Sequence, residues 1–159
     1  MHTLESVAVI MNMTICICGS LSFYDTSRSV KRQLEDAGYT VLWPWGMELM
    51  EQGTLNEEMM PEFKKKNQHT AIKRHYEKIK EADVVLIVNE EKNGIKNYIG
   101  GNTLIEMGFA HVLDKPIYLL HPIPDMTYRE ELEAMRPRVL RGNIKRIKNL
   151  INSSSNLSP

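Results

Sequence analysis

The sequence predicts an α/β protein in which a doubly wound, mostly parallel sheet lies between helices. The runs ADVVLIVN (82–89) and KPIYLLHP (115–122) are continuously apolar, which is typical of strands buried on both faces of a parallel sheet. Strand-like runs also alternate with helix-like patterns along the chain, as βα units do. The 159 residues suffice for one compact domain with a sizeable core.

The first third of the chain is expected to form a strand, a helix, a second strand and a loop. TICIC (14–18) is a short, apolar run rich in β-forming residues. A helix with an apolar stripe follows, and Asp25 or Thr26 can cap it. YTVLW (39–43) is the next strand, and residues 44–56 are expected to form a loop.

The remainder of the chain continues the alternation. A long helical pattern follows Pro61 and leads to the strand at 82–89. A loop rich in Asn and Gly then precedes a helix from about Thr103 to Leu113. The later elements are expected in the order strand 115–122, helix 128–135, strand 138–140 and helix 144–151. This gives a sheet of five strands.

The expected domain organisation is simple. Residues 1–13 form a flexible extension with neither a basic signal-peptide start nor a membrane-spanning run, residues 14–151 form a single α/β nucleoside-binding domain, and residues 152–159 form a disordered tail. Twenty basic and twenty acidic residues cancel, so the chain has no global attraction for a nucleic acid polymer or an anionic membrane. A small molecule is therefore the expected partner.

The two cysteines predict a reducing compartment. Cys16 and Cys18 lie two positions apart on one strand, too close for an ordinary disulfide, and we expect them to be reduced thiols in the cytoplasm. No second cysteine pair completes a zinc site, and His69, His111 and His121 show no metal-ligand spacing. The sequence thus predicts neither a metal nor a cofactor.

Two loops that follow strands carry candidate binding residues. Gly19 and Ser20 come after the first strand, where a glycine lets a phosphate or ribose approach the backbone; a plain strand-to-helix turn is an equal alternative. Gly100, Gly101 and Asn102 come after the third strand. The two glycines, together with Gly108, leave room for a sugar, and Asn102 is expected to position it. In a doubly wound sheet, ligands bind beyond the carboxyl ends of the strands.

Glu106 has two interpretations, which are compatible. Thr103 and Glu106 fit the Thr-x-x-Glu capping box, which satisfies free amide groups at a helix start. A carboxylate in a first helical turn is also favoured by the positive helix end, which would lower its pKa and keep it ionised. An ionised carboxylate beside a sugar can attack the anomeric carbon or stabilise a ribosyl cation. We expect Glu106 both to cap its helix and to line the site.

Three segments resemble the nucleoside 2-deoxyribosyltransferase family and its nucleotide N-hydrolase relatives. They are ICGS (17–20), EADVVLIV (81–88) and EMGFAHVLDKPIYLL (106–120), and the resemblance spans roughly residues 14–140. The resemblance implies a flavodoxin-like (Rossmann-like) fold. It also implies cleavage or transfer at the N-glycosidic bond of a nucleoside or nucleotide, with Glu106 as the nucleophile. The site would be completed across a homodimer or larger homo-oligomer. Cytokinin-activating phosphoribohydrolases are similar at Gly100-Gly101 and Thr103-x-x-Glu106.

The chain departs from the family pattern at polar partners of the nucleophile. His75 stands where the family usually has Asp, Gly100 where a further Asp or Ser sits, and Cys16 where a Tyr often lies. Because free imidazole titrates near neutrality, His75 can replace the Asp as an acid–base group; the alternative is a partly exposed helical histidine.

Phosphate recognition is left open by the sequence. Relatives that hydrolyse nucleotides place Arg where this chain has Leu21, and a Ser two residues before a Met in the segment that reaches the neighbouring subunit. Here the Met is Met135, a predicted substrate contact, and Glu133 takes the Ser position. An acid there favours an unphosphorylated substrate, unless a nearby arginine (Arg129, Arg136 or Arg138) compensates.

The leading hypothesis is therefore a transferase or glycosidase of nucleotide metabolism, with catalytic Glu106 and His75. The rival is a non-catalytic nucleoside- or nucleotide-binding or sensing homologue that has lost the Asp partners. A third alternative is an interaction protein that uses the basic helix at 62–80, although such charge runs are usually solvated faces.

Overall fold

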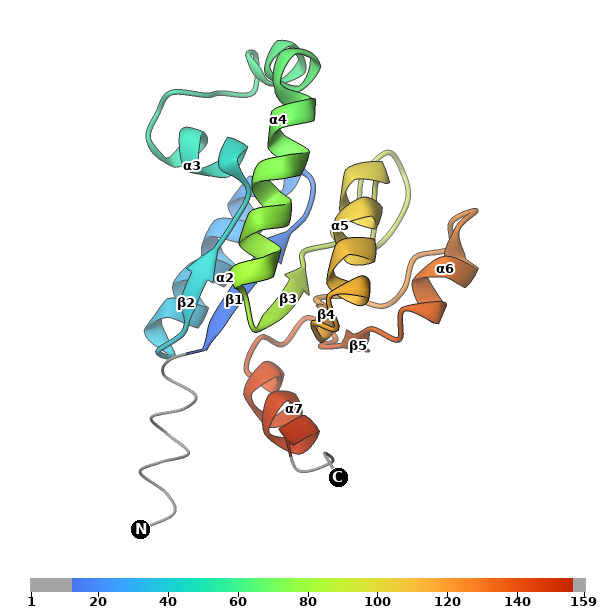
Figure 1. Cartoon of the computed structure of the whole chain (residues 1–159). Helices are drawn as coiled ribbons and strands as arrows, with labels where there is room; N and C mark the ends of the chain where they lie inside the picture. Colours follow the sequence, from blue (N-terminus) through green and yellow to red (C-terminus); the bar gives the residue numbers. More distant parts are fainter. Residues whose placement is uncertain (1–12, 156–159) are drawn as a thin grey trace.

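The computed structural model describes residues 13–155, and Figure 1 shows a central sheet with helices on both sides. The five strands lie in the order β2-β1-β3-β4-β5, and every neighbouring pair is parallel. This is the flavodoxin-like order, so the predicted fold class is confirmed. The strands are β1 (Thr14–Cys18), β2 (Thr40–Leu42), β3 (Val84–Ile87), β4 (Ile117–Leu119) and β5 (Arg138–Val139).

Helices alternate with these strands along the chain. They are the 3₁₀ turn η1 (Leu21–Phe23) and the α-helices α2 (Tyr24–Asp36), α3 (Trp45–Glu51), α4 (Met60–Glu81), α5 (Gly101–Val112), α6 (Arg129–Ala134) and α7 (Arg146–Ser155). No helix in the described part of the chain combines the length and the apolar character needed to cross a bilayer.

The sheet divides the core into two layers because successive strand residues point to opposite faces. One layer packs Ile15, Ile17 and Leu86 against apolar side chains of α2 and α7. The other packs Cys16 and Cys18 with side chains of α4 and α5, including Ile79, Met107 and Ala110. Figure 1 shows α4 and α5 side by side over one face of the sheet. The two cysteines therefore face the helices that carry His75 and Glu106.

The structure corrects two expectations near the site. Residues 45–51 form α3 rather than a loop, because Pro44 precedes the helix with an extended backbone and Met47 is fully buried. Helix α5 begins at Gly101, with Gly100 as a cap that makes no side-chain hydrogen bond. Thr103 therefore lies inside the helix, and the capping box predicted for Thr103 and Glu106 is wrong.

The ends of two helices also differ from expectation. Helix α2 begins at Tyr24 after the 3₁₀ turn, so Asp25 lies inside its first turn and neither Asp25 nor Thr26 caps it. Helix α7 continues to Ser155, so the predicted tail at 152–159 starts as helix. The rest of that tail, and the predicted extension apart from Met13, lie outside the described residues.

Gly19 is required by the close approach of two backbones. A Cβ atom at this position would lie 2.8 Å from the carbonyl oxygen of Val88, beyond the end of β3. Because backbone cannot move aside as a flexible side chain can, a larger residue here forces β1 and β3 apart. Gly19 is therefore needed for the packing of β1 against β3, apart from any contact that it makes with a ligand.

We expect Gly19→Ala to lower the free energy of unfolding by about 1–3 kcal/mol, the usual cost of overpacking. Urea denaturation followed by circular dichroism would measure this as a lower midpoint with an unchanged slope. Gly101→Ala is the matched control, because no atom lies within 4 Å of its added Cβ. Equal midpoints for the Gly19→Ala variant and the unmodified protein would contradict the expectation.

Candidate active site

A cavity of about 360 Å³ lies beyond the carboxyl ends of β1 and β3, between α4 and the start of α5. Its volume is in the range of small-molecule sites, and its place is the one expected for a doubly wound sheet. Of the predicted site residues, those that line it are Gly19, Ser20, His75, Gly100, Gly101, Asn102 and Glu106. The fold therefore brings three separate segments of the sequence to one cavity.

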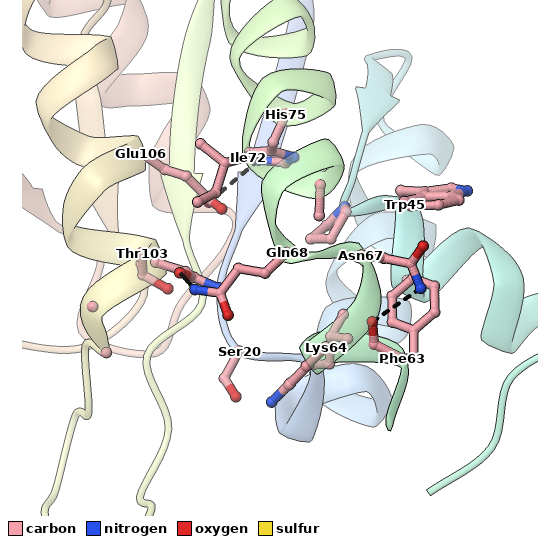
Figure 2. A pocket seen from close by; sticks show the side chains of 18 of the residues that line it. Ser20, Trp45, Phe63, Lys64, Asn67, Gln68, Ile72, His75, Thr103 and Glu106 are labelled. Carbon is pink, nitrogen blue, oxygen red and sulfur yellow. Dashed lines mark hydrogen bonds and ion pairs between the residues drawn. The ribbon is translucent and has the colours of Figure 1, made fainter. Parts of the chain in front are cut away.

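Glu106 and His75 meet at the wall of this cavity, as Figure 2 shows. Oε2 of Glu106 lies 3.4 Å from Nε2 of His75, and their side chains are 14% and 4% exposed. Neither Oε2 of Glu106 nor Nδ1 of His75 has a hydrogen-bond partner. The sequence alternative of a partly exposed helical His75 is wrong, since this side chain is buried and faces a carboxylate.

The two cysteines contact the same histidine nitrogen. Nε2 of His75 lies 3.5 Å from Sγ of Cys16 and 3.2 Å from Sγ of Cys18. Both cysteines are free and fully buried. Their contact with His75 was not expected from the sequence, because 57 or more residues separate them from it.

Burial and charge shift the pKa values of the acid–base pair. Burial raises the pKa of Glu106, although the positive charge of His75 opposes the shift. Burial by itself would lower the pKa of His75, but the negative charges of Glu106 and Cys16 outweigh it and raise the pKa to about 9. The lowered pKa expected for Glu106 is wrong, because the residue lies in the second turn of α5 and is largely desolvated.

The thiols are shifted in opposite directions. The hydrogen bond from Cys18 lowers the pKa of Cys16 to about 5, against the effect of burial and with help from the charge of His75. Burial raises the pKa of Cys18 well above its usual value. The protonated imidazole of His75 therefore lies among three acidic groups, namely Cys16, Cys18 and Glu106. Of these three, Glu106 lines the cavity.

Two lysines converge with Ser20 at another part of the cavity. Nζ of Lys92 donates a hydrogen bond to Oγ of Ser20 at 3.0 Å. Lys64 also lines the cavity, and burial, followed by the charge of Lys92, lowers its pKa. Figure 2 shows Lys64 and Ser20 on the same side of the cavity. Two cations and a hydroxyl in one place favour an anionic group on the ligand.

One face of α4 supplies a large part of the lining that the sequence analysis missed. Lys64, Gln68, Ile72 and His75 line the cavity at intervals of three and four residues. Nε2 of Gln68 donates a hydrogen bond to Oδ1 of Asn102 at 3.0 Å and so links α4 to α5. The helical spacing between these polar residues and His75 was a signal in the sequence that could have identified this face.

Aromatic residues complete the lining. Trp45 of α3 and Phe63 of α4 both line the cavity, with ring centroids 5.2 Å apart. The helix found in place of a loop at 45–51 is what brings Trp45 there. The two rings are inclined at 60° to each other, so each by itself offers a flat apolar face to a ligand.

Met135 is the predicted site residue that does not line the cavity. It is partly buried against the core layer that contains Cys16 and Cys18. Its expected contact is with a neighbouring subunit, so that contact stays a prediction. Nearby, Nε of Arg129 donates a hydrogen bond to Oε1 of Glu133 at 2.9 Å, so the acid expected to repel a phosphate is paired with a cation.

The fold and the cavity define a flavodoxin-like α/β protein with a buried carboxylate–imidazole pair. No family model and no curated protein matches the chain.

Solved structures that are similar to it include two enzymes. A 2-deoxyribosyltransferase from Bacillus psychrosaccharolyticus is 23% identical over 67% of this chain and 70% of its own, with a TM-score of 0.43. A Clostridium botulinum CMP N-glycosidase is 13% identical over 88% of this chain and 98% of its own, with a TM-score of 0.44.

Proposed function

We propose that this protein cleaves the N-glycosidic bond of a nucleotide, with Glu106 as the nucleophile and His75 as the acid–base group. The observation that supports this most directly is the contact of Glu106 with His75 at 3.4 Å in the wall of the cavity. Glycosidic cleavage uses a carboxylate and a proton donor on either side of the scissile bond, and this pair supplies both kinds of group at the cavity. The cavity volume and the aromatic lining fit a ligand that has a ring and a sugar.

The two pKa values suit these roles. With its pKa raised to about 9, His75 carries a proton at neutral pH and can give it to a departing base. Its positive charge also favours the ionised form of Glu106, although burial raises the pKa of this carboxyl. Groups whose environments hold them in opposite protonation states are typical of acid–base pairs in active sites.

The proposed reaction has two steps. In the first, an oxygen of Glu106 forms a bond to C1′ of the sugar while the bond from C1′ to the base nitrogen breaks. The electron pair of that bond stays on the base, which accepts the proton of His75. In the second step, water or another base attacks C1′ and the bond to Glu106 breaks. Neutral His75 then takes the proton of the attacking group, so both residues return to their first state.

The lysines favour a phosphorylated substrate. Lys64, Lys92 and Ser20 lie where a 5′-phosphate could be bound while the sugar contacts Glu106. Charged hydrogen bonds of this kind contribute roughly 1.5–3 kcal/mol each. The unphosphorylated substrate that Glu133 suggested is therefore less favoured, because the cations proposed to bind a phosphate come from α4 and from the loop after β3.

Incubation of the pure, chelator-treated protein with a panel of nucleosides and 5′-nucleotides tests the function. Free base measured by chromatography is the expected product. Tight binding without any base release would instead indicate the rival function, a nucleotide-binding or sensing protein. No binding and no release across the whole panel would contradict both.

We expect Lys64→Gln and Lys92→Gln each to raise KM for 5′-nucleotides by about 10- to 100-fold, because each removes one charged contact to the phosphate. KM for the matching nucleosides should be unchanged. Steady-state kinetics on a nucleotide and its nucleoside give both values. Lys73→Gln is the control, since Lys73 lies on α4 but is exposed. If each substitution raises KM by the same factor for the nucleotide and for the nucleoside, the lysines do not bind the phosphate.

The resemblance also supports a homodimer or larger homo-oligomer, and we retain this as a proposal. Met135 and the segment around α6 are the part of this chain that would reach the neighbouring cavity.

A further inference from the structure

The side chains of Cys16, Cys18 and His75 form a cluster, and the proposed base release uses only His75 of the three. Both sulfurs lie on β1 and point toward α4, where Nε2 of His75 lies 3.5 and 3.2 Å from them. The three ligand atoms are all within 4.8 Å of one another, and all three residues are buried. We propose that this cluster binds a zinc ion in the wall of the active-site cavity.

The distances fit a metal with these ligands. In a tetrahedral zinc site with Zn–S of about 2.3 Å and Zn–N of about 2.0 Å, a sulfur and a nitrogen ligand lie about 3.5 Å apart. The two observed separations of 3.5 and 3.2 Å are close to this value. Little rearrangement is therefore needed before an ion can be bound.

Glu106 offers a fourth ligand. Its Oε2 atom lies 3.4 Å from the same Nε2 of His75, is buried, and has no hydrogen-bond partner. In the tetrahedral geometry an oxygen and a nitrogen ligand lie about 3.3 Å apart. A buried carboxylate oxygen that is paired with His75 but accepts no well-formed hydrogen bond is costly, and a metal ion would lower this cost.

The number of protons in the cluster supports the same inference. Three atoms, namely the two sulfurs and Oε2 of Glu106, lie within 3.5 Å of a nitrogen that carries at most one hydrogen. One N–H group can point at only one of them, and the thiol of Cys18 can donate its hydrogen either to Cys16 or to Glu106 but not to both. A cation at the centre instead accepts a lone pair from each of the four atoms.

The ligand types select the metal. Thiolate and imidazole ligands favour zinc or copper(I) over magnesium and calcium, which prefer oxygen. A path for entry exists, because His75 and Glu106 line the cavity while the cysteines lie behind them. The sequence alone gave no sign of this site, since its third ligand lies on a helix distant in the chain.

Zinc should also control the reaction, a consequence that rests on the proposed function. A bound ion engages the lone pair of His75 and the carboxylate of Glu106, so neither group is free for cleavage. The metal-free protein is then the active form, and zinc is an inhibitor that chelation reverses.

Cobalt(II) titration of the chelator-treated, reduced protein tests the binding directly. We expect a thiolate-to-cobalt charge-transfer absorption that saturates at one equivalent and disappears when zinc is added. Magnesium should produce no change. Cys16→Ser and Cys18→Ser should each lose most of this absorption, and His75→Gln should weaken zinc binding at least tenfold. His111→Gln is the matched control, because His111 is exposed on α5.

The outcomes separate binding from function. Absence of the absorption in the folded protein, or its persistence in both serine variants, would overturn the site. Thermal melting checks that the variants fold, and Cys18→Ala replaces Cys18→Ser if the buried hydroxyl destabilises the core. Base release that stays constant as zinc saturates the protein would overturn the inhibition but leave the binding. If the protein releases no base at all, the cobalt titration still decides the site.

Discussion

Glu106→Gln is expected to reduce base release by about 10⁴-fold or more, because glutamine cannot form the covalent bond to C1′. The same change should leave the free energy of unfolding unchanged or raise it. In the folded protein Oε2 of Glu106 is buried without a hydrogen-bond partner, and burial raises the pKa of this carboxyl. A neutral amide of the same shape removes the cost of desolvating a charge. His75, whose pKa is lowered by burial and raised by this carboxylate, can then lose its proton instead of remaining an unpaired buried charge.

Two measurements on the same preparation check this prediction. Chromatography measures release of the base, and urea denaturation measures stability. Glu51→Gln is the control, because Glu51 is an exposed carboxylate at the end of α3 and does not line the cavity. A Glu106→Gln protein that turns over like the unmodified one would exclude a nucleophilic role. A large loss of stability would instead mean that Glu106 has a structural function.

His75→Gln is expected to lower the rate of base release by about 10²- to 10⁴-fold, the usual contribution of a positioned acid–base group. The loss should be greatest for bases that leave poorly, since these depend most on protonation during departure. Removal of the imidazolium should also raise the pKa of Glu106 further, because its charge opposes the effect of burial. Fewer molecules would then carry the ionised nucleophile at neutral pH.

Single-turnover kinetics with a series of bases of different leaving ability would reveal this dependence. These assays use chelator-treated protein. His75 is also a proposed zinc ligand, and in the metal-free protein its substitution cannot change the rate through a change in zinc binding. His111→Gln serves again as the exposed control. If the rate of base release falls by the same factor for good and for poor leaving bases, His75 only orients Glu106 or keeps it ionised.

Much of the fold follows from local sequence features. The apolar run at Val84–Ile87 is buried on both faces, so that it could form only a central strand of a parallel sheet. The alternation of such runs with helical patterns then leaves few chain topologies, and the observed order is one of the commonest. The glycines and Ser20 at the strand ends could also be placed in advance, because ligands of such sheets bind there.

The details of the site depended on the tertiary structure. The capping box was wrong because α5 begins at Gly101, before Thr103, and this places Glu106 in the second turn instead of at the helix start. The pKa of Glu106 is therefore governed by burial, which a linear sequence does not report.

The contacts of His75 depend on which face of a long helix turns toward the sheet. Helix α4 runs from Met60 to Glu81, and its packing on the sheet decides that His75 meets Cys16 and Cys18. Residue types and spacings in the sequence determined the class of fold and identified Glu106 as the candidate acidic residue of the site. Only the packing of α4 against β1 and α5 determined the four-atom cluster, because contacts between distant segments are set by helix phase and register, which no local pattern specifies.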